Sequence, residues 1–399
     1  MSKITRRSVL LGFGALPLVL AGCGGGGGGG DDGAAGPTGF AAKAVVDNVT
    51  DNIIVQTYRN LNTRAAALLA AVQALAAAPN DEAKMNLAQD AWKAARVPWE
   101  SSEGFLFGPV DSLLIDPAID SWPLDTPTLQ AFLAGNPNAT QAQIDNATDD
   151  VRGFHAMEYL LFGDGTTIND KPASALTTAE VNYLVALAQA FKARTQALET
   201  SWTTDFGGTG PFATTLKTPG AGRTYTNYAG VLQELLTGVT TIADEVGNAK
   251  MAEPMGATIG AADTSLVESQ YSWNSLTDFH NNIQSILNVY TGKLGYNWQS
   301  DTPSTSLNGL YSFVAFSNQT LATRVLNEII GAQKKIALIK GDGVDSTTVI
   351  SGSARPFRTQ ISDAAGRVLI EDAIAACNTL QKSFQDNVRP LLASTTFAN

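Results

Sequence analysis

The sequence predicts an all-α protein with two helical-bundle domains packed side by side, after an N-terminal signal and a flexible tether. Long alanine-rich stretches contain few β-branched residues. Apolar residues recur at helical spacing in these stretches. The clearest run is Leu61, Leu68, Leu69, Val72 and Leu75. At 399 residues the chain is long enough to bury two hydrophobic cores.

Residues 1–22 have the features of a bacterial lipoprotein signal peptide. A positively charged stretch with Arg6 and Arg7 precedes an apolar run over residues 9–20, which is too short to span a bilayer comfortably. The run ends in Leu20-Ala21-Gly22-Cys23, which resembles a lipobox. We therefore expect Cys23 to carry lipid and to become the first mature residue. The alternative is an ordinary signal peptide in which the cysteine occurs by chance.

A lipid on Cys23 would hold the protein at the bacterial cell envelope, facing the periplasm, with the outer membrane favoured over the inner one. Residues 23–39 begin with the cysteine and seven glycines and form the expected flexible tether. Cys377 is then the only other thiol, so no internal disulfide can form, and we expect it to be a buried apolar residue. The net charge of −11 argues against nucleic acid as a partner.

From residue 41 onward the pattern predicts one helix after another. Pro79 and Asn80 interrupt the first long helix, Asp81 can cap the next one, and Pro98 should kink or restart it. A stretch rich in Gly, Pro and Thr, residues 207–223, separates the two halves. The expected domains are therefore an N-terminal one at 40–215 and a C-terminal one at 216–399. The main helices are expected at residues 41–78, 82–97, 177–203, 224–250, 274–291, 317–340 and 356–388.

The clearest chemical feature is the pair His155 and Glu158, in a chain with only two histidines. Positions i and i+3 share one face of a helix, so the imidazole and the carboxylate lie side by side, like two metal ligands or an acid/base pair. The surrounding helix is apolar nearly all round, which predicts burial. The simpler interpretation is a core histidine hydrogen-bonded to its neighbour. His280 has no acidic partner at i+3 or i+4 and is interpreted as structural.

A second group of carboxylates lies in residues 96–111. Glu100 and Glu103 are also spaced i, i+3, and aromatic residues surround them, which is unusual for carboxylates on a surface. We therefore expect Glu103, and secondarily Glu100, to approach His155. The alternative is that Arg96 and Glu100 form an ordinary helix-surface pair while Glu103 is solvated.

Two of these segments resemble the signatures of the imelysin-like family, also described as insulin-cleaving membrane peptidases or iron-regulated protein A-like proteins. One is Gly153-x-His155-x-x-Glu158 followed by Tyr-Leu-Leu-Phe-Gly; the other runs from Arg96-x-Pro98-Trp99-Glu100-x-x-Glu103 to Gly108-Pro109. The run Asn288–Gly292 fits the family's C-terminal half, so the resemblance covers nearly all of residues 40–390. It implies two helical bundles with a site between them, export, frequent lipid anchoring, a link to iron or haem uptake, and a metallopeptidase activity.

We expect a site for a divalent or trivalent metal ion at the histidine and the nearby carboxylates. The expected ligands are His155, Glu158, Glu103 and Glu100, and the groups expected to balance the carboxylate charge are Arg96 and Arg152. Ligands rich in oxygen suit iron, manganese or calcium at least as well as zinc, and the implied link to iron favours iron over zinc.

Three functions remain open at this point. The chain could bind metal in iron or haem acquisition and pass it to a transport partner protein at the membrane. It could be an envelope metallopeptidase, although the sequence lacks His-Glu-x-x-His and shows no general base free of the metal. It could instead be a non-catalytic lipoprotein that binds a partner, with His155 and Glu158 purely structural. The first function is preferred.

Overall fold

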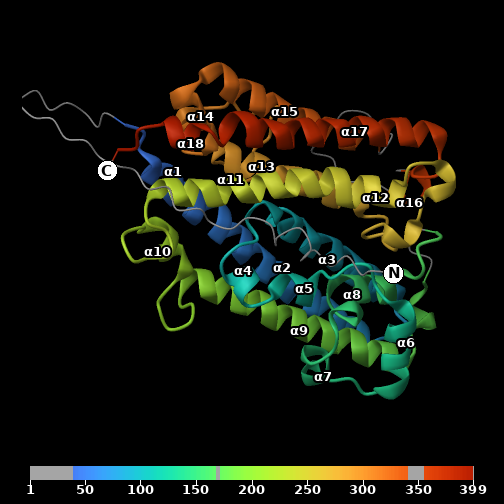
Figure 1. The fold of residues 1–399 in the computed structure, drawn as a ribbon. Coiled ribbons are helices and arrows are strands. Elements are labelled where there is room, and N and C mark those ends of the chain that lie inside the picture. The colour runs from blue at the N-terminus through green and yellow to red at the C-terminus, as the bar shows by residue number, and fades with distance from the viewer. Residues whose placement is uncertain (1–38, 168–170, 340–354, 399) are drawn as a thin grey trace, which may run out of the picture.

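The computed structural model describes residues 39–167, 171–339 and 355–398. Every regular element in these ranges is a helix, and the described chain contains no β-strand, only an isolated bridge between Phe40 and Phe397. The prediction of an all-α fold is therefore confirmed (Figure 1). The expected signal peptide, residues 1–22, and all but the last residue of the expected tether lie outside the described residues.

The first bundle is built on helices from the N-terminal half. They are α1 (Ala42–Asn48), the π-helix η2 (Val49–Ile54), α2 (Val55–Ala77), α3 (Glu82–Glu100) and α9 (Thr178–Thr203). Of these, α1, η2 and α2 follow one another without a break. Asp81 caps α3 as predicted, because its carboxylate accepts hydrogen bonds from the backbone N–H groups of Ala83 and Lys84. α3 runs through Pro98 without a break, two residues before its end. Helix α2 packs against both α3 and α9.

Short helices connect α3 to α9. They are η3 (Glu103–Phe105), α4 (Pro109–Ser112), α5 (Ile115–Ile119), α6 (Thr126–Gly135), α7 (Gln141–Asp145), η4 (Asp149–Val151), α8 (Gly153–Phe162) and η5 (Ala173–Ala175). Helix α8 packs against α3 and α9, and all its residues except Tyr159 are buried, as its apolar surface predicts. It ends at Gly163, which has a positive φ.

The second bundle follows the short helix α10 (Phe212–Lys217), which contains the expected domain boundary near residue 215. Its long members are α11 (Tyr228–Asp244), α13 (Ser275–Thr291), α15 (Gln319–Ile339) and α17 (Ala364–Lys382). Its shorter members are η6 (Glu245–Ala252), α12 (Glu253–Met255), η7 (Ile259–Ala261), η8 (Thr264–Leu266), η9 (Thr305–Leu307), α14 (Leu310–Ser317), α16 (Phe357–Gln360), η10 (Ser383–Val388) and α18 (Leu391–Ser394). Cys377 on α17 is fully buried, and burial raises the pKa of its thiol to about 12.

The two bundles meet where α13 packs on α3 and α11 packs on η3. Glycine makes the second contact possible, because a Cβ on Gly238 of α11 would lie 2.1 Å from the carbonyl oxygen of Gly104. On the other side, the Gly104 N–H donates to Ser285 Oγ at 3.0 Å. The end of α3 and the η3 turn are thereby fixed against both α11 and α13.

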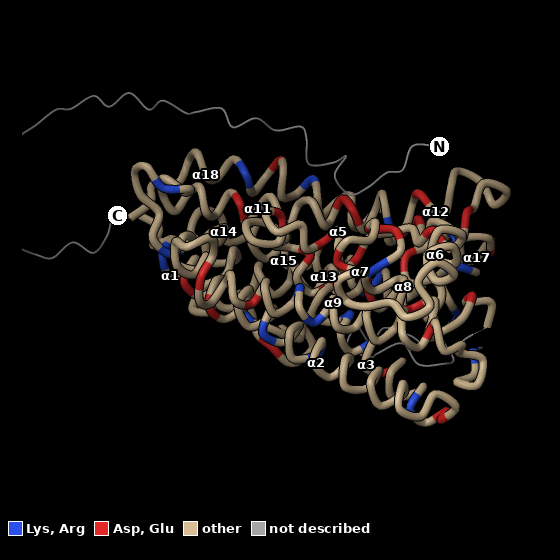
Figure 2. The backbone as a smooth tube through the Cα atoms, turned by 90° about the horizontal axis from the view of Figure 1, so that it is seen from below, with Lys and Arg blue, Asp and Glu red and all other residues tan. Residues whose placement is uncertain are grey.

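Charged residues of both signs occur along the whole length of the body (Figure 2). In the described part of the chain, no helix combines the length and the apolar character needed to cross a membrane. The buried carboxylates, by contrast, are concentrated in one place, around α3, α8 and α13.

Candidate metal centre

Six carboxylate side chains are buried in the described part of the protein, and all six belong to one cluster. They are Glu100, Glu103, Asp120, Glu158, Glu268 and Asp278. Two buried cations, Arg96 and Lys250, and the imidazole of His155 lie among them. A buried carboxylate must be paired, protonated or bound to a metal. Arg96, Lys250 and a protonated His155 can neutralise only three of the six, so the cluster has a surplus of potential negative charge.

Arg96 on α3 is the centre of this charge cluster, because its guanidinium contacts four carboxylates. Its Nη2 lies 2.5 Å from Glu100 Oε1, 3.2 Å from Glu268 Oε1 and 3.0 Å from Asp278 Oδ2, and its Nη1 donates to Asp120. Burial disfavours the charged form, but the four carboxylates outweigh it and raise the pKa of Arg96 well above its ordinary value. The predicted Arg96–Glu100 pair is therefore present, but it is buried rather than on a helix surface.

His155 is oriented by Glu158 from within α8. The Nδ1 atom of His155 lies 2.9 Å from Glu158 Oε2. The other carboxylate oxygen, Oε1, accepts hydrogen bonds from the backbone N–H of Ser272 at 2.8 Å and from Ser272 Oγ at 2.7 Å. Both oxygens of Glu158 are thus engaged. In this arrangement Glu158 holds the imidazole in place and leaves Nε2 as the ring atom that faces the other carboxylates.

The Nε2 atom of His155 faces Asp120 and Glu268. It lies 3.2 Å from Asp120 Oδ1 and 3.9 Å from Glu268 Oε1. Burial lowers the pKa of His155, but the hydrogen bonds with Asp120 and Glu158 outweigh this effect and raise the pKa to about 9. In the metal-free protein the imidazole is therefore protonated at neutral pH, and a metal ion at Nε2 has to displace that proton.

Gly153 is required where α8 begins next to Asp120. Its φ is +78°, and a Cβ there would lie 2.3 Å from the carbonyl oxygen of Ile119. A residue with a side chain would push α8 away from the end of α5. The glycine of the Gly153-x-His155 motif therefore brings His155 within reach of Asp120, the residue that follows Ile119.

Asp120 is held rigidly by the end of α3. Its Oδ2 accepts a hydrogen bond from Trp99 Nε1 at 2.6 Å, while its Oδ1 lies between Arg96 and His155. Asp120 was not among the ligands expected from the sequence. A weak signal exists, since this carboxylate follows a short apolar helix and precedes Trp122-Pro123.

Glu268 and Lys250 reach the cluster from the second bundle. Lys250 Nζ lies 2.8 Å from Glu268 Oε2 and 3.4 Å from Glu100 Oε2. Lys250 lies in the π-helix η6, and such irregular turns occur often at functional sites. Asp278, in the first turn of α13, accepts from Ser269 Oγ at 2.6 Å, and burial raises its pKa to about 7 although Arg96 opposes this. No local pattern in the sequence identified Lys250, Glu268 or Asp278 as members of the site.

The donor atoms fit a metal ion. Oδ of Asp120, Nε2 of His155 and Oε of Glu268 belong to one group whose ligand atoms lie within 4.8 Å of one another. Two ligands that each lie about 2.1 Å from an ion are separated by roughly 3–4 Å, and the distances from His155 Nε2, 3.2 and 3.9 Å, fall in this range. One imidazole with several carboxylates suits iron or manganese at least as well as zinc.

The structure brings His155, Glu158, Glu100 and Glu103 into one cluster, but in different positions. Glu103 is only 5% exposed and groups with Glu100 and Asp120 in a second set of ligand atoms within 4.8 Å of one another. Burial raises the pKa of Glu100 against the opposing effect of Arg96. His280 is half-buried and is in neither group of ligand atoms.

Arg152 does not take the place expected for it. Its guanidinium pairs with Asp149 and donates to the carbonyl oxygen of Asp145 at 2.9 Å. Arg152 precedes the first residue of α8 and has an extended backbone, with φ −132° and ψ −178°. Helical spacing therefore does not apply to it, and Lys250 supplies the second cation instead.

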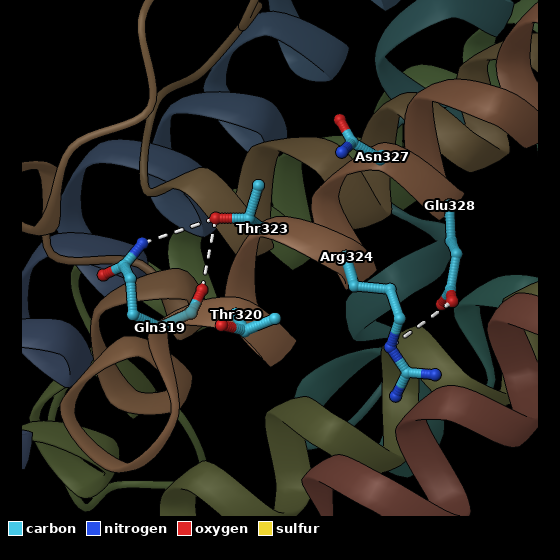
Figure 3. A pocket seen from close by; sticks show the side chains of 6 residues that line it. All are labelled: Gln319, Thr320, Thr323, Arg324, Asn327 and Glu328. Carbon is cyan, nitrogen blue, oxygen red and sulfur yellow. Dashed lines mark hydrogen bonds and ion pairs between the residues drawn. The ribbon is translucent and has the colours of Figure 1, made fainter.

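A separate hollow runs along one face of α15 (Figure 3). Its lining residues are Gln319, Thr320, Thr323, Arg324, Asn327 and Glu328. All of them lie on the same helix, and Arg324 Nε is 3.9 Å from Glu328 Oε1. The buried cluster, in contrast, collects ionisable groups from both bundles, and it is therefore the candidate site.

Comparisons with known proteins agree with this architecture. The sequence model of the imelysin family matches residues 54–384. The iron-regulated protein A of Synechococcus elongatus is 25% identical over 347 residues, which cover 87% of this chain and 86% of that protein. The crystal structure of a candidate iron-regulated protein A precursor from Parabacteroides distasonis is similar, with a TM-score of 0.75, 28% identity, and coverage of 90% of this chain and 97% of that one. An imelysin-like protein from Psychrobacter arcticum shares the fold, with a TM-score of 0.65 and 13% identity over 88% of this chain and 95% of that one.

Proposed function

Because the chain belongs to the imelysin family, we propose that it is an envelope protein that binds a metal ion and serves iron or haem acquisition. Iron is the favoured ion and zinc the alternative. The name of the relative from Synechococcus elongatus, iron-regulated protein A, supports the link to iron. The motif Leu20-Ala21-Gly22-Cys23 supports a lipid on Cys23 that anchors the protein, facing the periplasm at the outer membrane, where it passes the metal to a transport partner.

One observation supports metal binding above all others: the surplus of buried carboxylates around His155 Nε2. Arg96, Lys250 and a protonated His155 can neutralise only three of the six buried carboxylates, and burial disfavours every unpaired charge. A divalent or trivalent ion between Asp120, His155 and Glu268 would reduce this surplus, because it brings two or three positive charges and displaces one proton. This ligand set differs from the one expected from the sequence, because Glu158 is already engaged with His155 and Ser272.

The remaining groups have supporting roles in this proposal. Glu158 accepts from His155 Nδ1 and so fixes the ring with Nε2 toward the ion. Arg96 and Lys250 hold Asp120, Glu268 and Glu100 close together in spite of their mutual repulsion. The bound ion would be a Lewis acid and, if it is iron, a redox centre.

A metallopeptidase function is less well supported by the site. None of the six carboxylates is more than 5% exposed, so a peptide has no open surface from which to reach them. The carboxylates next to His155 are also engaged with Arg96 or Lys250, whereas hydrolysis needs a base that can take a proton from water.

The chain has a natural control for a test, since it contains two histidines of which only His155 lies in the cluster. The full-length mature protein is purified without an affinity tag and its metal content is measured, together with His155→Ala and His280→Ala. We expect near-stoichiometric metal in the wild type and in His280→Ala, and loss of metal in His155→Ala with the fold retained. Equal metal content in both variants would contradict the proposed site. Proteolysis that a chelator abolishes would favour the peptidase instead.

A further inference from the structure

We propose that Trp122 closes the candidate metal centre and controls access to it, by joining the two loops that carry Asp120 and Glu268. The role of this cover in metal exchange rests on the function proposed above. The cover itself is a property of the metal-free protein and can be tested without any metal.

The centre cannot exchange an ion with solvent unless something moves. The exposed fractions of His155, Asp120 and Glu268 are 0%, 1% and 3%. Trp122 is only half-buried, and its ring lies edge-on to the imidazole of His155 with the ring centroids 4.7 Å apart. The indole therefore covers one side of the imidazole, and part of its own surface is exposed to solvent.

One hydrogen bond joins the two loops across this wall. Trp122 Nε1 donates to the carbonyl oxygen of Leu266 at 3.1 Å. Trp122 follows Asp120 by two residues, and Leu266 precedes Glu268 by two residues. The bond thus connects the Trp122 segment (residues 120–124), from the first bundle, to the Glu268 segment (residues 266–274), from the second. When this contact opens, the indole can move away from His155 and expose the imidazole.

The Glu268 segment contains strained backbone, and hydrogen bonds to the first bundle hold it in the closed arrangement. Ser269 and Trp273 have φ values of +50° and +59°, a region that residues with side chains rarely adopt. The segment is fixed by Ser272, which donates to Glu158, and by Trp273 Nε1, which donates to the carbonyl oxygen of Gly165 at 2.8 Å. Such strain reduces the free energy needed to leave the closed arrangement, which suits a segment that has to open for exchange.

The first test measures how fast diethyl pyrocarbonate modifies His155 in the full-length metal-free protein, by mass spectrometry of the peptides. All variants are compared at one pH that is alkaline enough for part of the His155 imidazole to be neutral, because only the neutral ring reacts. His280 is the internal reference. In Trp122→Ala we expect His155 to react at least about tenfold faster, because both the ring contact and the hydrogen bond are lost. Trp122→Phe keeps a ring but lacks the N–H donor. We expect the reaction rate at His155 to rise by about fivefold in this variant, which corresponds to the loss of one hydrogen bond. Trp298→Phe, at a half-buried tryptophan that packs on Lys334, is the matched control and should react as the wild type.

Two results would contradict the proposal that Trp122 covers His155. One is an unchanged rate at His155 in folded Trp122→Ala. The other is an equal acceleration at His155 and His280, which would indicate general loosening of the protein. Circular dichroism establishes that each variant is folded.

A second test follows Fe²⁺ and Zn²⁺ uptake and release by stopped flow with a chelating dye. Association and dissociation should both accelerate in Trp122→Phe, by similar factors, so that Kd changes less than either rate. Slower association, or faster dissociation with unchanged association, would contradict control of access. The wild type could bind neither ion while the reaction rate of His155 still depends on Trp122. That result would contradict the proposed metal-binding function but would support the proposal that Trp122 covers His155.

Discussion

The carboxylate of Glu158 in the first bundle accepts two hydrogen bonds from Ser272 in the second, while its other oxygen holds His155 Nδ1. The orientation of the imidazole therefore depends on the packing of the two bundles. Neither bundle alone contains the complete centre, because Asp120 and His155 come from the first and Glu268 from the second.

Ser272→Ala should weaken metal binding by about tenfold, the usual size of an effect from a residue that orients a ligand. The substitution removes the Oγ hydrogen bond at 2.7 Å but leaves the backbone N–H of residue 272 in place. Affinity is measured by competition with a chelator. Ser394→Ala, at an exposed serine of α18, is the control. An affinity equal to that of the wild type would show that Glu158 is held well enough without the hydroxyl.

Arg96→Met should destabilise the protein by about 3–5 kcal/mol at neutral pH, because four buried carboxylates lose their shared cation. Thermal unfolding measures the loss. The deficit should shrink at acidic pH, where the carboxylates can take up protons. Arg367→Met is the matched control, since Arg367 is also buried but donates to the carbonyl oxygens of Met255, Gly256 and Ile361. A deficit at Arg96 that acid does not reduce would contradict this account.

The metal-free protein should lose stability as the pH rises from about 4 to about 9. The pKa of Asp278 is raised to about 7 and that of His155 to about 9, so the folded state binds both protons more tightly than the unfolded state does. Each contribution is complete below the ordinary pKa of the group and is lost as the pH passes its raised value. Urea unfolding with a chelator present measures this trend.

Substitution divides that pH dependence into two parts. Asp278→Asn should flatten the curve between about pH 4 and 7, and His155→Gln between about pH 6.5 and 9. If either variant keeps the slope of the wild type in its own range, the corresponding pKa is not raised by the fold.

Gly153→Ala should destabilise the protein by more than about 2 kcal/mol and abolish metal binding. The added Cβ would meet the Ile119 carbonyl oxygen at 2.3 Å, and φ is +78°. Gly331→Ala is the control, because this glycine lies inside α15 with nothing within 4 Å of the added Cβ, so the change should be neutral or stabilising by up to about 1 kcal/mol. Thermal unfolding compares the two, and similar results for both would refute the role given to Gly153.

Cys23→Ser should leave an unprocessed precursor that incorporates no labelled lipid, because the lipobox resemblance depends on that thiol. Metabolic labelling with a fatty acid checks this. Cys377→Ser is the control and should be labelled as the wild type, since its thiol is buried. Lipid on the Cys23→Ser protein would refute the proposed anchor.

Local features of the sequence were enough to predict most of the long helices and part of the site, but not the short helices, and the helix expected at 356–388 is divided into α16 and α17. Helical spacing and the cap at Asp81 depend on neighbouring residues, and both appear in the structure. The contact between His155 and Glu158 is equally local, because i and i+3 meet on any helix. Arg152 was expected to balance the carboxylate charge, but it lies outside α8, which begins one residue later, and its guanidinium pairs with Asp149.

The rest of the candidate centre depends on which helix faces meet, and that was decided by tertiary packing. Asp120, Lys250, Glu268 and Asp278 contact Arg96, Glu100 or His155 from segments far away along the chain. Nothing in the periodicity of a single helix specifies its partner in another bundle. That choice is made by close approaches such as that of Gly238 to Gly104, and by the need to pair every buried charge when the two bundles pack together.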